Sequence, residues 1–221
     1  MQISQQLKEV IAERHLLKHP FYQAWSNGEL SQEILKNYAS QYYAHVESFP
    51  RFISRVHSGC PTIAARKVLL QNLVDEELHG TDHPALWMQF AEGLGATREA
   101  VVSEQPIAET QDLIDSFFDI ASRDWRDGLC ALFAYESQVP DVSVSKIDGL
   151  KRFYGITDEQ VLKFFTVHQQ YDVEHANQVA VLVDQYADRD QAVKATKEAA
   201  DALWRFLDGM CRVAGIKCEM N

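Results

Sequence analysis

Apolar residues recur on a helical period along most of the chain, and the two-residue alternation typical of strands is almost absent. Short turn signals, among them His19-Pro20 and Ser26-Asn27-Gly28, separate the periodic stretches. This pattern predicts an all-α fold. The expected helices cover residues 3–17, 21–25, 32–57, 62–78, 84–94, 108–123, 128–151 and 191–213, together with one helix after residue 160.

Local signals refine the ends and bends of these helices. Ser31 is expected to cap the helix of residues 32–57, and residues 157–160 (TDEQ) have the pattern of a capping box for the helix that follows them. Pro50 should kink the first of these helices. Pro140 should bend the helix of residues 128–151, because proline interrupts the hydrogen-bond ladder.

The composition fits one globular domain. The 221 residues, 46% of them hydrophobic, are enough for a sizeable core, and no Pro/Gly/Ser-rich linker divides them, so we expect a single domain over residues 1–221. The formal charge of -11 argues against nucleic acid and anionic membranes as partners and favours a small molecule. The amino-terminal sequence lacks the pattern of a secretory signal, and no run of roughly eighteen apolar residues could span a bilayer. We therefore expect a cytoplasmic protein.

Four cysteines are scattered along the chain: Cys60, Cys130, Cys211 and Cys218. None of them belongs to a CxxC pair. In a reducing compartment this arrangement predicts free thiols, and it argues against a disulfide framework or a thiolate zinc site.

The stretch FTVHQQYDVEHANQV, residues 165–179, places three candidate metal ligands on one helix. At about 100° per residue, steps of four and seven positions put His168, Asp172 and His175 on a common face. If that face were exposed, the three would form an ordinary solvated polar stripe. Here they interrupt an apolar stripe that should face the core, formed by Phe164, Phe165, Val179 and Leu182. A buried carboxylate needs a partner, and a metal ion is one.

Two other regions offer further ligands, which a metal bound by only three side chains would need. In QNLVDEELHGTDHPALW, residues 71–87, Glu76 is followed by His79 and His83, and the spacing leaves open which histidine joins it. In ALFAYESQVP, residues 131–140, Glu136 is a single acid in an otherwise apolar helix. The candidate set then holds three carboxylates and three imidazoles.

Ferritin-like bundles hold two metal ions with inward glutamates and Glu-x-x-His pairs. Asp172-Val-Glu-His175 keeps this acid-to-histidine spacing, but the fourth carboxylate is missing and His168 would take its place. Mixed imidazole and carboxylate ligands with open positions suit iron, or manganese with iron, in oxygen chemistry. Three neighbours of these motifs are interpreted as solvated groups or as groups that hold a ligand without binding the metal: Glu77, His79 and Glu174. The remaining histidines are interpreted as structural: His15, His19, His45 and His57.

Five segments have an order and spacing specific to one family: HPFYQAWSNGEL (19–30), NYASQYYAHVESFPRF (37–52), NLVDEELHGTDHPALW (72–87), AYESQVP (134–140) and VHQQYDVEHA (167–176). They resemble the chlamydial protein associating with death domains and its bacterial relatives. These CADD-like proteins are haem-oxygenase-like di-metal oxidases, related to the thiaminase-II and pyrroloquinoline-quinone-synthase branches.

The resemblance implies a seven-helix haem-oxygenase-like bundle without haem that binds two transition-metal ions, Fe/Fe or Mn/Fe. It also implies an oxidase that makes p-aminobenzoate for folate synthesis, with dioxygen and a reductant as co-substrates. It places the metal ligands at Glu76, His83, Glu136, His168, Asp172 and His175, and so selects His83 over His79. We also expect a homodimer.

The same resemblance implies that the protein consumes its own side chains, once per chain. The family's source of the aromatic ring falls on Tyr22 and its amino donor on Lys146. From the residues alone, Tyr22 would be a core aromatic with a bonded hydroxyl and Lys146 a solvated surface amine. Five other phenols could relay electrons or hold substrate, and the sequence does not rank them: Tyr38, Tyr42, Tyr43, Tyr135 and Tyr171.

Three other functions stay open at this point. A thiaminase-like hydrolase would need a nucleophilic cysteine, and Cys130 lies six residues before Glu136, although a lone thiol in an apolar helix is more often a core residue. A cofactor-free oxidase of the quinone-synthase type would bind a bulky acidic substrate with basic side chains. A death-domain binding module is suggested by the family's name, but the sequence has no recognisable partner-binding motif.

Overall fold

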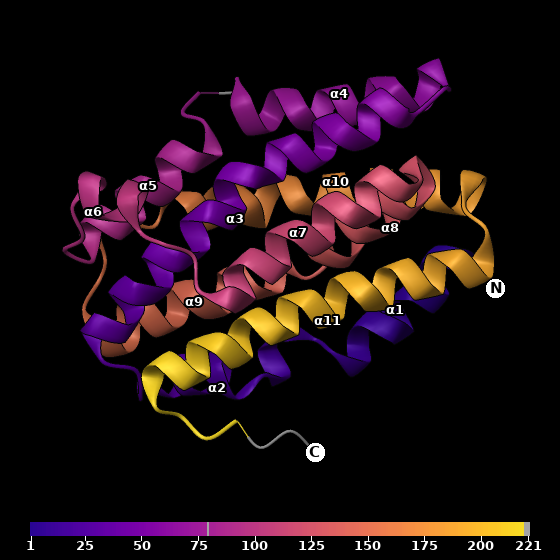
Figure 1. Cartoon of the computed structure of the whole chain (residues 1–221). Coiled ribbons are helices and arrows are strands. Elements are labelled where there is room, and N and C mark those ends of the chain that lie inside the picture. The colour runs from indigo at the N-terminus through magenta and orange to yellow at the C-terminus, as the bar shows by residue number, and fades with distance from the viewer. Residues whose placement is uncertain (79, 219–221) are drawn as a thin grey trace.

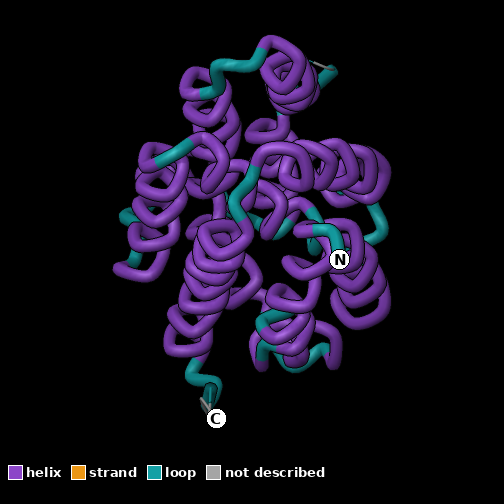
Figure 2. Tube along the Cα trace, turned by 90° about the vertical axis from the view of Figure 1, so that its right-hand side faces the viewer, coloured by secondary structure: helices purple, strands orange, loops and turns teal. Residues whose placement is uncertain are grey.

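Helices make up all the regular secondary structure of residues 1–78 and 80–218, the part of the chain that the computed structural model describes. The prediction of an all-α fold is confirmed (Figures 1 and 2). The described elements are α1 (Ile3–Glu13), the 3-10 helix η1 (Leu16–Lys18), α2 (Pro20–Asn27), α3 (Gln32–Gly59), α4 (Ile63–Glu77), α5 (His83–Gly93), α6 (Arg98–Ser103), α7 (Ala108–Arg123), α8 (Trp125–Glu136), α9 (Val139–Tyr154), α10 (Lys163–Tyr186) and α11 (Arg189–Ala214).

Local signals set several of the helix ends as predicted. The Ser31 hydroxyl accepts a hydrogen bond from the backbone N–H of Ile34 and so caps α3. Pro50 lies inside this helix. Gly28 ends α2 in the left-handed conformation, with φ of 72°, which a residue without a side chain adopts at low cost.

Two local predictions are wrong. The stretch of residues 128–151 is divided into α8 and α9, because the chain turns at Ser137 and Gln138; Pro140 then lies in the first turn of α9, where its missing N–H is not needed. The capping box of residues 157–160 does not cap a helix, since α10 begins only at Lys163. Such breaks, and the short α6, divide the described chain into eleven α-helices where the resemblance implied seven.

The long helices lie side by side around a shared core (Figure 1). α11 packs along α7, α8 and α1, while α3 packs against α4, α5 and α7. α10 lies against α8 and α9 and also contacts α5 and α4. The buried apolar side chains form one continuous cluster to which nearly all of these helices contribute. None of the helices within the described residues is long and apolar enough to cross a membrane.

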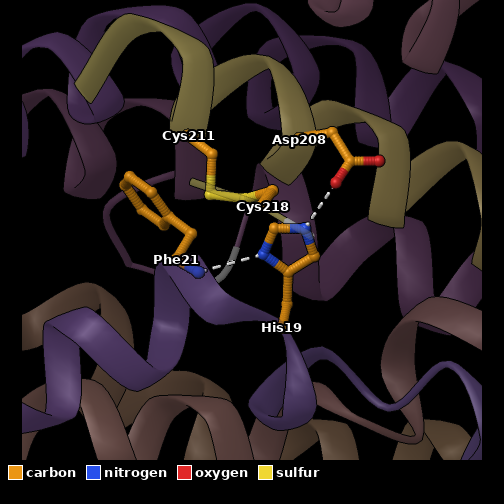
Figure 3. Close-up of a disulfide and its surroundings, with 5 residues drawn as sticks. All are labelled: His19, Phe21, Asp208, Cys211 and Cys218. Carbon is orange, nitrogen blue, oxygen red and sulfur yellow. Dashed lines mark hydrogen bonds and ion pairs between the residues drawn. A yellow bond between two sulfur atoms is a disulfide. The ribbon is translucent and has the colours of Figure 1, made fainter. Parts of the chain in front are cut away.

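The carboxyl-terminal segment folds back onto the bundle. Gly215, with φ of 66°, ends α11 and lets the chain reverse, so that Cys218 approaches Cys211 and forms a disulfide with a Cα–Cα distance of 6.2 Å (Figure 3). The prediction of free thiols is therefore wrong for this pair and right for Cys60 and Cys130. The spacing missed the pair because only the turn after α11 brings the two sulfur atoms together.

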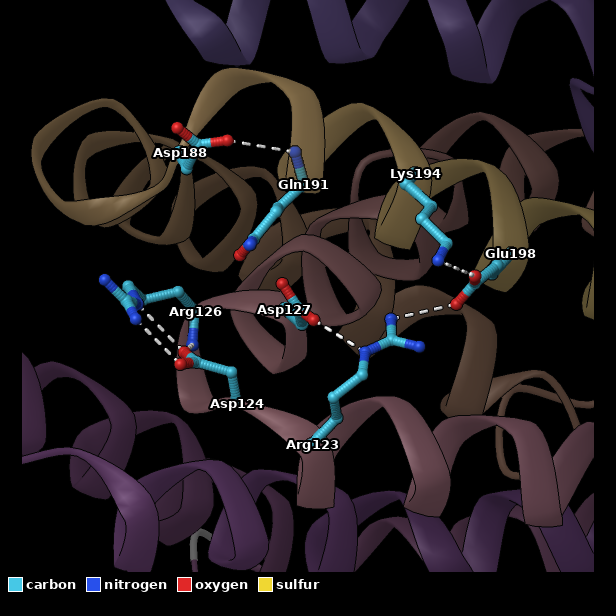
Figure 4. A network of polar contacts seen from close by, with 8 residues as sticks. All are labelled: Arg123, Asp124, Arg126, Asp127, Asp188, Gln191, Lys194 and Glu198. Atoms are coloured by element: carbon cyan, nitrogen blue, oxygen red, sulfur yellow. Dashed lines mark hydrogen bonds and ion pairs between the residues drawn. The ribbon is translucent and has the colours of Figure 1, made fainter.

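Charged side chains join α7, α8 and α11 at the surface (Figure 4). The Arg123 guanidinium lies 2.7 Å from Asp127 Oδ2 and 2.9 Å from Glu198 Oε2. Lys194 adds a longer contact of 3.9 Å to Glu198. Because these groups are partly exposed to water, such pairs contribute little to stability, up to about 1 kcal/mol each.

His45 of α3 is enclosed in the core by aromatic rings, with 0% of its surface exposed. This burial lowers the pKa of His45 from 6.5 to about 3. As the pH falls from 6.5 toward about 3, His45 takes up a proton in the unfolded chain but stays neutral in the folded chain. The folded state therefore loses stability below pH 6.5, by about 2 kcal/mol between about pH 6 and about pH 4.5.

The variant His45→Phe tests this dependence, because Phe packs as a ring but cannot take up a proton. Its free energy of unfolding should fall less steeply with acid than that of the wild type, as measured by urea denaturation at a series of pH values. Parallel pH profiles for the two proteins would show that His45 does not contribute.

Candidate metal centre

Helix α10 carries His168, Asp172 and His175 on one buried face, with 3%, 2% and 3% of their surface exposed. The backbone carbonyl of Phe164 lies 2.7 Å from Nδ1 of His168 and accepts its proton. This bond fixes the ring and leaves Nε2 available as a ligand atom. Burial lowers the pKa of His168 well below its usual value, so the imidazole is neutral, as metal binding requires.

The segment between α4 and α5 brings Glu76 and His83 together from the two sides of a turn. Oε2 of Glu76 lies 2.6 Å from Nδ1 of His83, and both side chains are buried. Burial alone would lower the pKa of His83, but the Glu76 carboxylate outweighs this effect and raises it. The ligand atoms of Glu76, His83 and His168 all lie within 4.8 Å of one another. His79, the competing histidine, lies outside the described residues.

Glu136, the last residue of α8, is the third candidate carboxylate. Its Oε1 accepts a hydrogen bond of 2.6 Å from the Asn72 side chain of α4, and only 1% of the residue is exposed. Burial raises the pKa of Glu136 to about 8, and the carboxylates of Asp172 and Glu76 act in the same direction. This mutual repulsion shows that the three acids lie close enough to share one electrostatic environment.

His175 is held between two aspartates. Its Nε2 donates to Oδ2 of Asp75 over 2.9 Å, and its Nδ1 lies 3.8 Å from Oδ1 of Asp172. Burial disfavours the protonated ring, but Asp172, Glu136 and Asp75 outweigh it and raise the pKa of His175 to about 9. A histidine whose far nitrogen donates to a carboxylate, with the near nitrogen free, has the arrangement found at protein metal sites.

The six side chains fit a metal centre because the protein itself leaves their ligand atoms unsatisfied. Within the described residues, four such buried atoms have no hydrogen-bond partner: His83 Nδ1, Glu136 Oε2, Asp172 Oδ2 and His175 Nδ1. The short contact between His83 and Glu76 lacks the alignment of a hydrogen bond. Unsatisfied polar atoms are costly to bury, and cations would satisfy all four. Three carboxylates and three imidazoles suit iron or manganese.

Sequence reasoning missed two residues that support this cluster, Asp75 and Asn72. Both are buried, on the face of α4 that also carries Glu76. Their spacing of three and four residues was a usable signal, since polar residues that share a helix face with a candidate ligand can hold other ligands. Of the neighbours interpreted as outer or solvated, Glu77 and Glu174 are exposed.

Tyr22 and Lys146 belong to a second buried cluster, formed by side chains of α2, α3 and α9. Lys146 is only 5% exposed, so its interpretation from the residues alone as a solvated surface amine is wrong. Its Nζ donates to the Tyr38 hydroxyl over 2.7 Å, and the hydroxyls of Tyr38 and Tyr22 are also 2.7 Å apart. Tyr22 is, as the residues alone suggested, a core aromatic with a bonded hydroxyl.

Comparison with known proteins gives this arrangement a family. The profile of a family described as iron-containing redox enzymes matches residues 36–209. The chain belongs to this family. It is similar to the 4-aminobenzoate synthase of Nitrosomonas europaea, with 41% identity over 97% of this chain and 94% of that protein. It is 37% identical to the 4-aminobenzoate synthase of Chlamydia trachomatis, over 94% of this chain and 91% of that protein.

The fold of this redox enzyme also matches solved structures. A domain of unknown function with a haem-oxygenase-like fold from Shewanella denitrificans superposes with a TM-score of 0.79 at 17% identity, over 98% of this chain and 96% of that one. The predictions of a haem-oxygenase-like fold and of an oxidase are thereby confirmed. The roles of the individual site residues stay predictions.

A pocket of about 710 Å³ gives small molecules a route from solvent to the ligands of this redox enzyme. His83 and Asp75 form part of its wall, together with the half-exposed ring of Tyr171. Lys163 lines the pocket together with the carboxylates of Asp75 and Glu159. The pocket is therefore not built to attract a large anionic substrate.

Cys130 does not fit the nucleophile of a thiaminase-like hydrolase. The thiol is fully buried in α8. Burial raises its pKa to about 12, so that the reactive thiolate is scarcely formed near neutral pH. In this redox enzyme Cys130 is a core residue.

The six candidate ligands predict a metal stoichiometry. Anaerobically loaded protein should bind about two transition-metal ions per chain, and Glu76→Ala, Glu136→Ala or His168→Ala should lower that number in elemental analysis. Affinity should fall as the pH drops, since protons compete for imidazole and carboxylate. Glu77→Ala is the matched control, because Glu77 is the exposed neighbour of Glu76 and should bind nothing. Full loading of all three ligand variants would rule out this centre.

Asp75 is expected to act through His175. Without an acceptor for its Nε2 proton the ring is free to turn, so Asp75→Ala should weaken metal binding by about 10- to 100-fold in titrations against a competing chelator. Asp75→Asn keeps an oxygen that can accept the same proton, and it should lose less affinity. If both variants bind metal as tightly as the wild type, the contact has no role in the centre.

Proposed function

We propose that this protein is a di-metal oxidase that makes 4-aminobenzoate for folate synthesis, and that Tyr22 supplies the aromatic ring and Lys146 the amino group. Its relatives named 4-aminobenzoate synthase, which align along almost the whole chain, support the product. The observation that carries the proposal is the contact between a buried amine and a buried phenol at the two positions concerned.

Helices α2 and α9 bring this amine and this phenol together. Lys146 Nζ lies 4.9 Å from the centre of the Tyr22 ring and 2.7 Å from the hydroxyl of Tyr38, which in turn contacts the Tyr22 hydroxyl. Gly149 permits the close approach, because a Cβ there would come within 2.8 Å of the Trp25 side chain of α2. The ring and the nitrogen of an aminobenzoate are thus neighbours before any reaction.

Burial prepares both groups for this chemistry. It lowers the pKa of Lys146 well below 10.5, so the amine is neutral and its lone pair can attack carbon. It raises the pKa of Tyr22, so the phenol keeps its proton until it is oxidised. Six aromatic rings surround Nζ and exclude water from it: those of Tyr22, Trp25, Tyr38, Tyr42, Trp87 and Phe165.

Three of the other phenols, Tyr135, Tyr42 and Tyr38, have contacts that favour a role in this reaction. The Tyr42 hydroxyl donates to that of Tyr135 over 3.2 Å, and the rings of Tyr42 and Tyr38 are stacked with centres 5.5 Å apart. Tyr135 directly precedes Glu136, and the carboxylates of Asp172 and Glu76 both help to raise its pKa. These contacts support a path for oxidation from the candidate ligands through Tyr135, Tyr42 and Tyr38 to Tyr22.

The metal ions would be two irons, or manganese with iron, held by the six candidate ligands. When bound, they would supply an oxidant from dioxygen and an external reductant. The ring of Tyr22 leaves the chain in this proposal, so each chain acts once. The homodimer and the cytoplasmic location stay predictions that accompany it.

The alternatives find less support. A cofactor-free quinone-synthase type of reaction calls for basic side chains around an acidic substrate, whereas Lys163 stands beside two carboxylates in the pocket next to the ligands. A death-domain binding role would not explain why the candidate metal ligands and the amine of Lys146 are buried.

Isotope-labelled tyrosine tests the source of the ring. Protein grown with it, purified, loaded with iron or with manganese and iron, and exposed to oxygen and reductant should release labelled 4-aminobenzoate with no tyrosine added. The yield should not exceed about one per chain. Mass spectrometry of the peptide that contains Tyr22 should show the loss of its side chain. Tyr22→Phe should abolish the product and keep the metal content, because Phe packs alike but lacks the oxidisable phenol.

Lys146→Arg is the companion variant, since it offers a cation in place of the primary amine and should also lose the product. Tyr186→Phe and Lys151→Arg are the matched controls, because both residues lie outside the cluster and should leave the yield unchanged. Sustained turnover of an added substrate by Tyr22→Phe would mean that the chain is a conventional metalloenzyme and would refute the self-consuming reaction.

A further inference from the structure

His45 is a buried polar side chain that the proposed path does not use. Both of its ring nitrogens are buried without a hydrogen-bond partner in the described structure. Such an imidazole costs free energy that a phenylalanine at the same place would not cost. The sequence interpretation of His45 as merely structural does not explain why a ring with two nitrogens occupies this position.

The polar groups nearest to His45 are phenols of the path. Its ring centre lies 5.0 Å from that of Tyr42 and 5.1 Å from that of Tyr135. The remaining ring neighbours are apolar: Phe49, Phe52 and Phe117. Burial lowers the pKa of His45, and no charged side chain among the described residues contributes to that shift.

Tyr135 has a hydroxyl donor that is not used in a hydrogen bond to any described residue. Its oxygen accepts the proton of Tyr42, and within the described residues its own proton has no acceptor. Hydrogen-bond capacity is thus left over on both sides of one ring contact: a donor on Tyr135, and one acceptor nitrogen and one N–H donor on the neutral ring of His45. The two rings are in edge contact, with their centres 5.1 Å apart.

We propose that His45 is the proton acceptor for the oxidation of Tyr135. This inference rests on the proposed function, because it assigns a step within that oxidation. Tyr135 gives one electron to the oxidant that the centre makes from dioxygen and reductant, and its O–H proton passes to a ring nitrogen of His45. The products are a neutral phenoxyl radical and an imidazolium. Tyr42, whose hydroxyl donates to the Tyr135 oxygen, then passes that proton and an electron to the radical, so that Tyr135 is restored, Tyr42 becomes the neutral phenoxyl radical and His45 holds the first proton.

The energetics of the cluster favour a base at this point. A buried phenol that loses an electron but keeps its proton becomes a cation in an apolar site, which is very costly. The low pKa of His45 keeps the ring neutral, with a lone pair free, at every working pH. An oxidised phenol is a far stronger acid than imidazolium, so even this weak base accepts its proton.

The first experiment needs no metal. Azide radicals, generated by pulse radiolysis, oxidise tyrosines in the metal-free protein, and the signal from Tyr135 is the part that Tyr135→Phe removes. In His45→Phe this part should form on the order of a hundredfold more slowly, which is the effect of removing a positioned base. Phe49→Leu is the matched control, because it alters the packing around Tyr135 and keeps the imidazole.

Chemical rescue separates the base from the packing. In His45→Ala, added imidazole should enter the cavity and restore the fast oxidation of Tyr135, whereas benzene should fill the cavity without restoring it. Equal rates in the wild type and His45→Phe, equal slowing by Phe49→Leu, or rescue by benzene would each overturn the proposal.

The loaded protein gives the second readout. His45→Phe should keep the metal content and lose most of the 4-aminobenzoate. If the wild type makes no such product while the metal-free experiment gives the expected result, the proposed function fails and the role of His45 stands. If the wild type makes the product and His45→Phe makes it equally fast, the role of His45 fails and the proposed function stands.

Discussion

The structure depends on the burial of ionisable side chains that hydrophobic packing cannot compensate. The carboxylates of Asp172 and Glu136 lie in the core with an oxygen atom unpaired, and the neighbouring acids make each of them harder to ionise. His175 offsets part of their charge, since it lowers the pKa of both against the effect of burial. Asn72 holds one oxygen of Glu136, and Asp75 holds the far nitrogen of His175, so that the remaining ligand atoms are fixed and free. Buried ligand atoms left unpaired are costly, and bound cations would offset that cost at the point where four helices converge.

In the second buried cluster, that of Lys146, Tyr22 and Tyr38, burial keeps the ionisable side chains neutral. At Lys146 no counter-ion is present among the contacts of the amine, and the surrounding rings make the neutral form the stable one. Tyr22 and Tyr38 keep their protons for the same reason. An amine and a phenol that are both neutral can lie in contact indefinitely without reacting. In the proposed reaction they stay unreacted until Tyr22 is oxidised, and the contacts of Tyr135, Tyr42 and Tyr38 are the path proposed for that oxidation.

Local signals were sufficient where a helix is defined by its own residues. The helix expected over residues 108–123 is α7 with the same bounds, and Ser31 caps α3 as expected. They failed where distant contacts decide. The turn between α8 and α9 is held by Gln138, whose side chain accepts from the backbone N–H of Leu16, 122 residues away. Asp158, and not Thr157, binds the backbone N–H groups before α10. No pattern within either segment contains that information.

Some of the site residues could have been found from the sequence. A polar residue inside an apolar helical stripe identified His168, and the same pattern surrounds Lys146, whose neighbours at steps of three and four, Val142 and Leu150 among them, are buried. It also surrounds His45 on α3. From the residues alone, Lys146 was interpreted as a solvated amine and His45 as structural, so a general expectation about residue type outweighed the position of the residue; Lys146 became a candidate only through the family resemblance. The position of the residue is the better guide, because the free-energy cost of burying a polar side chain depends on its surroundings. A costly buried polar side chain therefore indicates a functional position.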